Sequence, residues 1–223
     1  MANTLGNGIR AERKLLITVA EWTGASHDVY TLTTSQPANW ATNYTDYYTK
    51  SGNTYVQVTG ANAPTWTANT YYSKTTTTRY REILGTRTED SSVEFNADIQ
   101  TSTDIRGISY ADVNKTEPQQ DLDPFYVMGG SDLAIYLSKN ALKNNITAYS
   151  NFADIYLITA YDDVSETSTP AYYTVKHQAC SIIPTAIGGD AYVNMPIEIH
   201  LSNDIVEGSV DTLTEGFTFT AAS

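Results

Sequence analysis

The sequence has a single cysteine, Cys180, and no apolar run long enough to cross a bilayer. One thiol excludes an intrachain disulfide framework, and a membrane-spanning helix needs roughly 18 or more consecutive apolar residues. Residues 1–8 are polar and lack the basic and apolar regions of a secretory signal. We therefore expect a protein without a membrane partner that stays in the compartment where it is made.

Basic residues are also scarce. The 13 Lys and Arg stand against 25 Asp and Glu, so the formal net charge is −12, and tight binding to nucleic-acid phosphates is disfavoured. The chain is instead rich in tyrosine, with 17 residues, and in threonine, a composition typical of β-strands. A chain of 223 residues is long enough to bury the core of one large all-β domain or two small ones.

Alternation of apolar and polar residues predicts a mainly β protein with one α-helix. The helix is predicted over 131–144, with Ser131 as N-cap and an apolar stripe that includes Leu133, Leu137 and Leu142. Strands are expected at 15–20, 80–84, 92–96, 154–160, 171–183, 192–202 and 212–220. The polar segment 101–124 has no sustained period and is predicted to be a long loop with at most one short strand.

Residues 28–78 differ in amino-acid composition from the rest of the chain. They are nearly uncharged and contain an imperfect duplication, in which WATNYTDYYTK (40–50) is followed by WTANTYYSK (66–74). This pattern predicts two β-hairpins, turned at 51–53 and 60–62 and inserted into a host domain formed by 1–27 and 79–223. The repeated aromatic residues fit either a carbohydrate-stacking platform or rings that pack on their own repeat.

The sequence offers little for catalysis or for binding a cofactor. His177 and Cys180 form an H-x-x-C pair without a second pair at ligand spacing, and Asp162 and Asp163 belong to no calcium-binding pattern. No glycine-rich loop has the companions that phosphate binding requires. We therefore expect no enzyme, no cofactor and no metal. A hydrolase remains an alternative, which would need activity that depends on one named carboxylate.

Several stretches of the sequence resemble the major tail tube proteins of long-tailed bacteriophages and prophages of Gram-positive bacteria. They are MANTLGNGIR (1–10), RTEDSSVEFNAD (87–98), TDIRG (103–107), VNKTEP (113–118), DP (123–124), IGGDAYVNMP (187–196), LSND (201–204) and FTFT (217–220). The order and extent of these stretches carry the resemblance, which covers almost everything outside 28–78.

The resemblance implies a phage tail tube fold, an antiparallel β-sandwich or open barrel with one flanking α-helix, and a structural role. Proteins of this family form hexameric rings that stack into a hollow tube, the conduit for DNA ejection. The expected partners are further copies of the chain and the tape measure, terminator and distal tail proteins, with DNA present only in transit. The expected location is the virion tail, assembled in the cytoplasm of the host bacterium.

Two sets of charged residues follow as candidate sites. Contacts between copies are expected at charged residues of the N-terminal arm and of two polar segments: Arg10, Arg87, Glu89, Asp104, Arg106, Lys115 and Glu117. The lumen is expected to be lined by the polar faces of 92–96 and 192–202, with Glu94, Glu198 and His200, because carboxylates repel DNA phosphates. The alternative is that these faces meet the outer solvent and that their acidity aids solubility. The alternatives for the whole chain are a glycan- or protein-binding module of a cell surface, or the tube subunit of a phage-tail-like bacteriocin.

Overall fold

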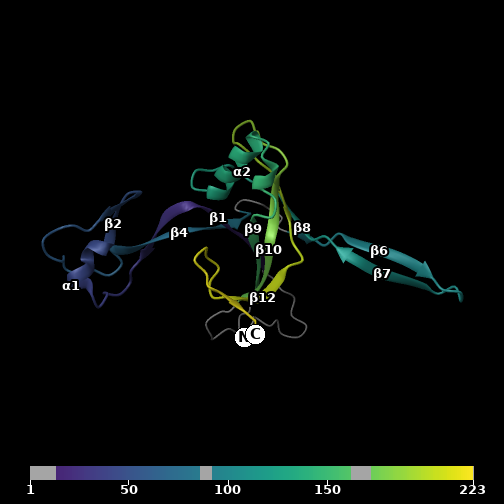
Figure 1. The fold of residues 1–223 in the computed structure, drawn as a ribbon, viewed down its shortest axis with the longest axis horizontal. Helices are drawn as coiled ribbons and strands as arrows, with labels where there is room; N and C mark the ends of the chain where they lie inside the picture. Colours follow the sequence, from purple (N-terminus) through teal and green to yellow (C-terminus); the bar gives the residue numbers. More distant parts are fainter. Residues whose placement is uncertain (1–13, 86–91, 162–171, 223) are drawn as a thin grey trace. The chain divides into compact units, whose positions relative to one another are not determined.

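The computed structural model describes residues 14–85, 92–161 and 172–222. The predicted contact residues Arg10, Arg87 and Glu89 and the pair Asp162 and Asp163 lie outside these ranges. The chain divides into two compact units, one made of the residues up to Thr23 and from Tyr80 onward, the other of Gly24–Arg79. The second unit encloses the predicted insertion, 28–78. Strands β1 and β4 each contribute residues to both units (Figure 1).

The structure is mainly β, with antiparallel sheets, as predicted. The elements are β1 (Lys14–Leu32), α1 (Trp40–Asn43), β2 (Tyr47–Ser51), β3 (Thr54–Gln57), β4 (Tyr71–Leu84), β5 (Val93–Glu94), β6 (Ala97–Thr103), β7 (Ser109–Thr116), β8 (Gln119–Leu122), α2 (Asp132–Leu142), β9 (Ala153–Tyr161), β10 (Tyr172–Pro184), β11 (Ile197–His200), β12 (Ile205–Val210) and β13 (Phe219–Ala221), with short 3-10 turns at Tyr44–Asp46 and Ile146–Ala148. The large sheet runs β3-β2-β4-β1-β9-β10-β11-β8-β5. Strand β12 pairs with β10 and β13, while β6 and β7 form a sheet of their own.

The sheet of the first unit is buried on both faces around β1 and β9. On one face, Ile155 of β9 packs with Ile182 of β10 and with Leu133 and Leu137 of α2. On the other, Ile158 of β9 packs with Val19, Tyr156, Val210 and Phe217, the last two from the C-terminal part of the chain. Burial on both faces explains why β1 begins with a continuous apolar run rather than an alternating one.

Helix α2 confirms the predicted helix. The hydroxyl of Ser131 accepts a hydrogen bond from the backbone N–H of Ala134 at 3.1 Å, as an N-cap residue does. Leu133 and Leu137 are buried, as predicted, but Leu142 is 74% exposed because the helix ends at this residue. A second helix, the four-residue α1, was not predicted.

Four predicted strands or loops are corrected by the structure. The strand predicted over 212–220 is confined to its end, where β13 covers Phe219–Ala221. The segment 101–124 is not a loop, because it contains the end of β6 and all of β7 and β8. The strand predicted over 192–202 is confined to Ile197–His200, since the residues before it form a loop closed by a bridge between Gly188 and Asn194. The strand predicted over 92–96 is confined to Val93–Glu94, and Phe95 is 66% exposed.

The second unit has a small aromatic core. Trp40, Val58 and Tyr71 are buried and pack with Tyr47 and Trp66. Of the two predicted hairpins, β2–β3 is present, with Ser51 and Thr54 paired across the turn. The second hairpin is wrong, because residues 58–70 contain no strand and the second repeat instead begins β4, which pairs with β2.

Candidate assembly surfaces

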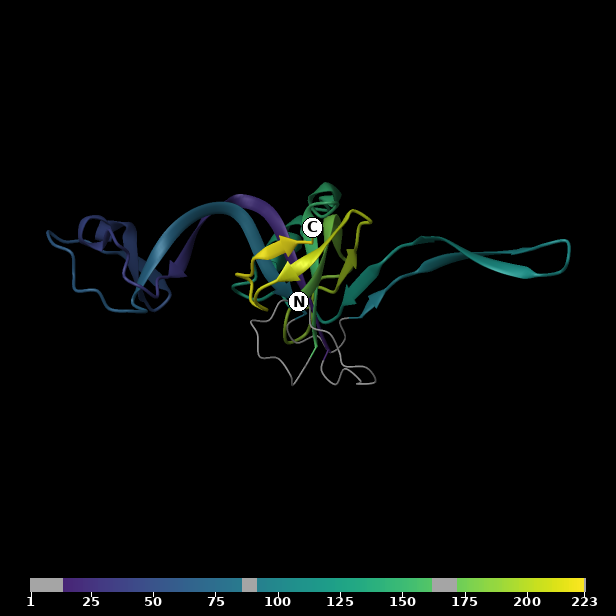
Figure 2. The same cartoon turned by 90° about the horizontal axis from the view of Figure 1, so that it is seen from below.

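Strands β6 and β7 form a two-stranded hairpin, drawn in teal in Figure 2. Every residue of both strands is exposed. The register joins Ile99 to Val113 and Thr103 to Ser109, with an irregularity between Asp98 and Ile99. The whole hairpin thus lies outside the hydrophobic core of its unit.

The two faces of this hairpin differ in chemistry. Opposite residues in an antiparallel pair share a face. One face is therefore uncharged and partly apolar, with Ile99 57% and Val113 60% exposed. It consists of Ile99, Thr101, Thr103, Ser109, Ala111 and Val113. The other face is polar and carries the pairs Gln100 with Asp112 and Asp98 with Lys115. We call the first of these the uncharged hairpin face.

The tip of the hairpin is a compact turn organised by Asp104. Its carboxylate accepts hydrogen bonds from the backbone N–H groups of Ile108 (3.0 Å) and Arg106 (2.8 Å), and the Arg106 guanidinium lies 2.8 Å away. These donors hold the pKa of Asp104 below its usual value, the bond from Ile108 contributing most. Gly107 has φ of 78°, which favours glycine. The side chain of Ile105 is fully exposed at this tip.

Four of the predicted contact residues are paired within the chain. Arg106 pairs with Asp104, and Lys115 pairs with Glu117 at 2.5 Å. The hydrogen bond from Lys115 lowers the pKa of Glu117. Because these charges are exposed, exchanging them for partners on another copy would change the free energy little. That they contact another copy stays a prediction.

The three residues predicted to line a lumen lie on one face of the β11-β8-β5 sheet. Glu94 is opposite Gln119, which is opposite His200, while Glu198 is opposite Asp121. His200 Nε2 lies 3.5 Å from Glu198 Oε2. The opposite face is buried through Gln120, Ile197 and Ile199. Gln119 and Asp121 belong to the same polar face and were missed, because the sequence around them was taken for a loop.

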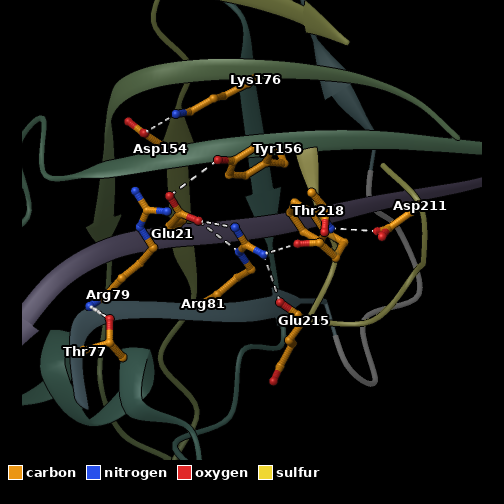
Figure 3. A network of polar contacts seen from close by, with 11 residues as sticks. Glu21, Thr77, Arg79, Arg81, Asp154, Tyr156, Lys176, Asp211, Glu215 and Thr218 are labelled. Carbon is orange, nitrogen blue, oxygen red and sulfur yellow. Dashed lines mark hydrogen bonds and ion pairs between the residues drawn. The ribbon is translucent and has the colours of Figure 1, made fainter. Parts of the chain in front are cut away.

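A polar network fixes the C-terminal segment to the first unit (Figure 3). Arg81 of β4 donates from Nε to Glu21 of β1 at 3.0 Å and from Nη1 to the carbonyl of Phe217 at 2.7 Å. Its guanidinium also lies 3.9 Å from the centre of the Phe217 ring. Further along the segment, the backbone N–H of Thr218 donates to Asp211 at 2.7 Å. The network was not predicted, because Glu21 and Arg81 are 60 positions apart.

The other candidates from the sequence are structural. His177 Nδ1 lies 2.7 Å from the carbonyl oxygen of Ser202, and Cys180 is buried, which raises the pKa of its thiol. Among the described residues, no three His, Cys, Asp or Glu side chains gather as metal ligands would. In the same residues, no helix has the length and apolarity needed to cross a membrane.

Comparison with known proteins adds no relative: no family model matches the chain, and no significant match is found among curated proteins or solved structures.

Proposed function

We propose that this chain is a major tail tube protein of a long-tailed bacteriophage or prophage of Gram-positive bacteria. Copies of the chain would form hexameric rings that stack into the conduit for DNA ejection. The role is structural rather than catalytic. The sequence stretches described above suggest the family, and the observation that carries the proposal is the β6–β7 hairpin with its exposed uncharged face.

An isolated two-stranded hairpin is marginally stable in water, because only a third strand or a packed face buries enough apolar surface. All residues of β6 and β7 are exposed in the single chain. A second copy that covers the uncharged hairpin face would bury Ile99 and Val113 and protect open strand edges from uncontrolled pairing. Self-assembly would therefore give this hairpin the packed apolar face that it lacks in the single chain.

A tube also fits the charge of the chain. Contacts between different patches of identical copies propagate without limit, as a filament requires. The net charge of −12 and the polar face with Glu94 and Glu198 suit a wall past which DNA moves without adhering. Tape measure, terminator and distal tail proteins would bound such a tube, and the assembled particle would be the virion tail.

The test is electron microscopy of the concentrated full chain, with sedimentation velocity to measure assembly. We expect rings or tubes, and we expect the variant Ile99→Lys with Val113→Lys to remain monomeric, because it places charge on the uncharged hairpin face. The control is Gln100→Lys with Ser102→Lys, which adds the same charge to the other face of β6. A parent chain that stays monomeric at every concentration and salt tested, or two variants that assemble equally, would overturn the proposal.

A further inference from the structure

The duplication in the second unit separates its tyrosines onto two faces. Successive residues of a strand point to opposite faces, so the first tyrosine of each Tyr-Tyr pair and the second must lie on different sides. Tyr47 and Tyr71 pack in the core with Trp40. Tyr48 and Tyr72 are directly opposite each other on β2 and β4, and they lie on the other face.

This other face gathers four half-buried tyrosine rings from four strands: Tyr30, Tyr48, Tyr55 and Tyr72. Tyr30 and Tyr55 are stacked, with ring centres 4.0 Å apart and planes 2° from parallel. Tyr48 meets Tyr30 edge-on at 5.0 Å, and Tyr72 meets Tyr55 edge-on at 5.1 Å. We call these four residues the outer tyrosine face. Each of the four rings therefore contacts at least one other ring of the group in the single chain.

Two lysines flank the outer tyrosine face. Lys50 lies 5.5 Å from the ring centre of Tyr55, and Lys74 lies 5.8 Å from that of Tyr48. The two lysines occupy equivalent positions of the duplication, each two residues after the outer tyrosine of its repeat. Lys74 also pairs with Asp28 at 2.9 Å, which fixes its position beside the rings. The face thus offers aromatic rings and cations at once.

The charge of this unit sets it apart from the rest of the protein. Residues 24–79 contain three basic residues (Lys50, Lys74 and Arg79) against two acidic ones (Asp28 and Asp46), whereas the whole chain has a net charge of −12. The outer tyrosine face is therefore complementary to an anionic ligand.

We propose that the outer tyrosine face binds an anionic polysaccharide. The apolar C–H faces of pyranose rings would stack on the accessible parts of the half-buried tyrosine rings, and the phenol hydroxyls would hydrogen-bond to sugar hydroxyls. The acidic groups of the polymer would pair with Lys50 and Lys74. The proposal does not depend on tube formation, because every group named belongs to one copy of the chain.

The test is isothermal titration of the full chain with polygalacturonate, a uronic-acid polymer, beside dextran, a neutral one. We expect binding of polygalacturonate that weakens as salt is raised, and weaker or undetectable binding of dextran. Lys50→Gln with Lys74→Gln should weaken binding of polygalacturonate by about tenfold or more, which corresponds to roughly 1.4 kcal/mol. Tyr55→Leu should weaken it comparably, while Tyr55→Phe should retain most of it.

The matched control is Val56→Thr, on the same strand as Tyr55 but on its other face and 51% exposed. It should leave binding unchanged. If Tyr55→Leu perturbs the unit, the lysine variant and the salt dependence still decide. The proposal is overturned if the full chain binds no polygalacturonate, if it binds dextran equally well, or if Val56→Thr weakens binding as much as the lysine variant does. None of these outcomes bears on whether the chain assembles into tubes.

Discussion

Arg81 and Glu21 form an ion pair with little access to water, since their side chains are only 19% and 6% exposed. Strands β4 and β1 are neighbours in the sheet, so the pair joins them directly. The Nη1 atom of Arg81 donates hydrogen bonds to the carbonyl oxygens of Glu215 and Phe217. One side chain therefore connects two sheet strands to the segment that covers one face of the sheet.

Replacing Arg81 by leucine should destabilise the protein strongly. The change removes the Arg81 guanidinium from the buried Glu21 carboxylate, and breaking a buried ion pair by removing one partner typically costs about 3–5 kcal/mol. The double variant Glu21→Leu with Arg81→Leu should recover part of this loss. The free energy of unfolding from urea titration measures both. Arg106→Leu is the control, because its pair with Asp104 is exposed to solvent and should contribute little to the free energy of unfolding. Equal losses for Arg81→Leu and Arg106→Leu would contradict the prediction.

Glu82 should make stability depend on pH in a defined direction. Its carboxylate accepts hydrogen bonds from Ser131 and from the N–H of Leu133 at the start of α2. Burial nevertheless raises its pKa above the usual 4.5, and this effect exceeds that of the hydrogen bonds, which lower it. The folded protein therefore holds this proton more tightly than the unfolded chain does. The resulting stabilisation is present below the usual pKa and is lost as pH rises through the raised one.

The variant Glu82→Gln replaces the carboxyl group by an amide that does not ionise, so it lacks this pH dependence. Its free energy of unfolding relative to the parent should therefore rise between about pH 4 and pH 7. Asp211→Asn is the contrasting variant, because the hydrogen bond from the N–H of Thr218 lowers the pKa of Asp211. That variant should lose stability relative to the parent at neutral pH, and the difference should shrink as pH falls. Urea unfolding across this range measures both, and a pH-independent difference for Glu82→Gln would refute the assignment.

Excising Gly24–Arg79 should leave the first unit folded. Trp22 and Tyr80 stack with ring centres 5.4 Å apart on the neighbouring strands β1 and β4. A short Gly-Ser turn from Thr23 to Tyr80 would therefore close a hairpin that already exists, and exposed insertions tolerate such removal. We expect a soluble chain with cooperative thermal unfolding by circular dichroism. An insoluble or unfolded product would mean that the insertion is part of the host fold.

The sequence predicted the elements whose signals are local. Helix α2 could be predicted because its N-cap, Ser131, and two leucines of its apolar face, Leu133 and Leu137, lie within a few residues of one another. The β6–β7 hairpin was missed for a physical reason: strands are recognised by an apolar face that the core buries, and every residue of β6 and β7 is exposed in the described part of the chain. The face shared by Glu94 and His200 was expected only in part, because strand register across a hundred residues follows from the fold and not from spacing.

Cys180 should be unreactive in the folded protein. The thiol is buried, and burial raises its pKa, so little thiolate is available at neutral pH. Labelling with a thiol reagent such as iodoacetamide, followed by mass spectrometry, should be slow in buffer and rapid in denaturing urea. The backbone N–H of Ser202 donates a hydrogen bond to the sulfur at 3.4 Å, so the thiol already has a hydrogen-bond partner within the folded protein. Rapid labelling of the native chain would show that the site opens to solvent.

Reversing charge on the polar face of β11-β8-β5 tests the predicted lumen. Glu94 lies opposite Gln119, and Glu198 lies opposite Asp121, all on the same face of the sheet. His200 shares that face and lies beside Glu198. In tails built from Glu94→Lys with Glu198→Lys, a basic wall would bind DNA phosphates with release of counterions, so DNA ejection should slow and regain speed at high salt. The matched control is Asp204→Lys with Glu207→Lys, a double reversal of exposed residues on or next to β12, outside the polar face. If both doubly reversed tails eject DNA at the parent rate, or if a tube reconstruction places Glu94 and Glu198 on the outer wall, these residues do not line the lumen and their acidity serves solubility alone.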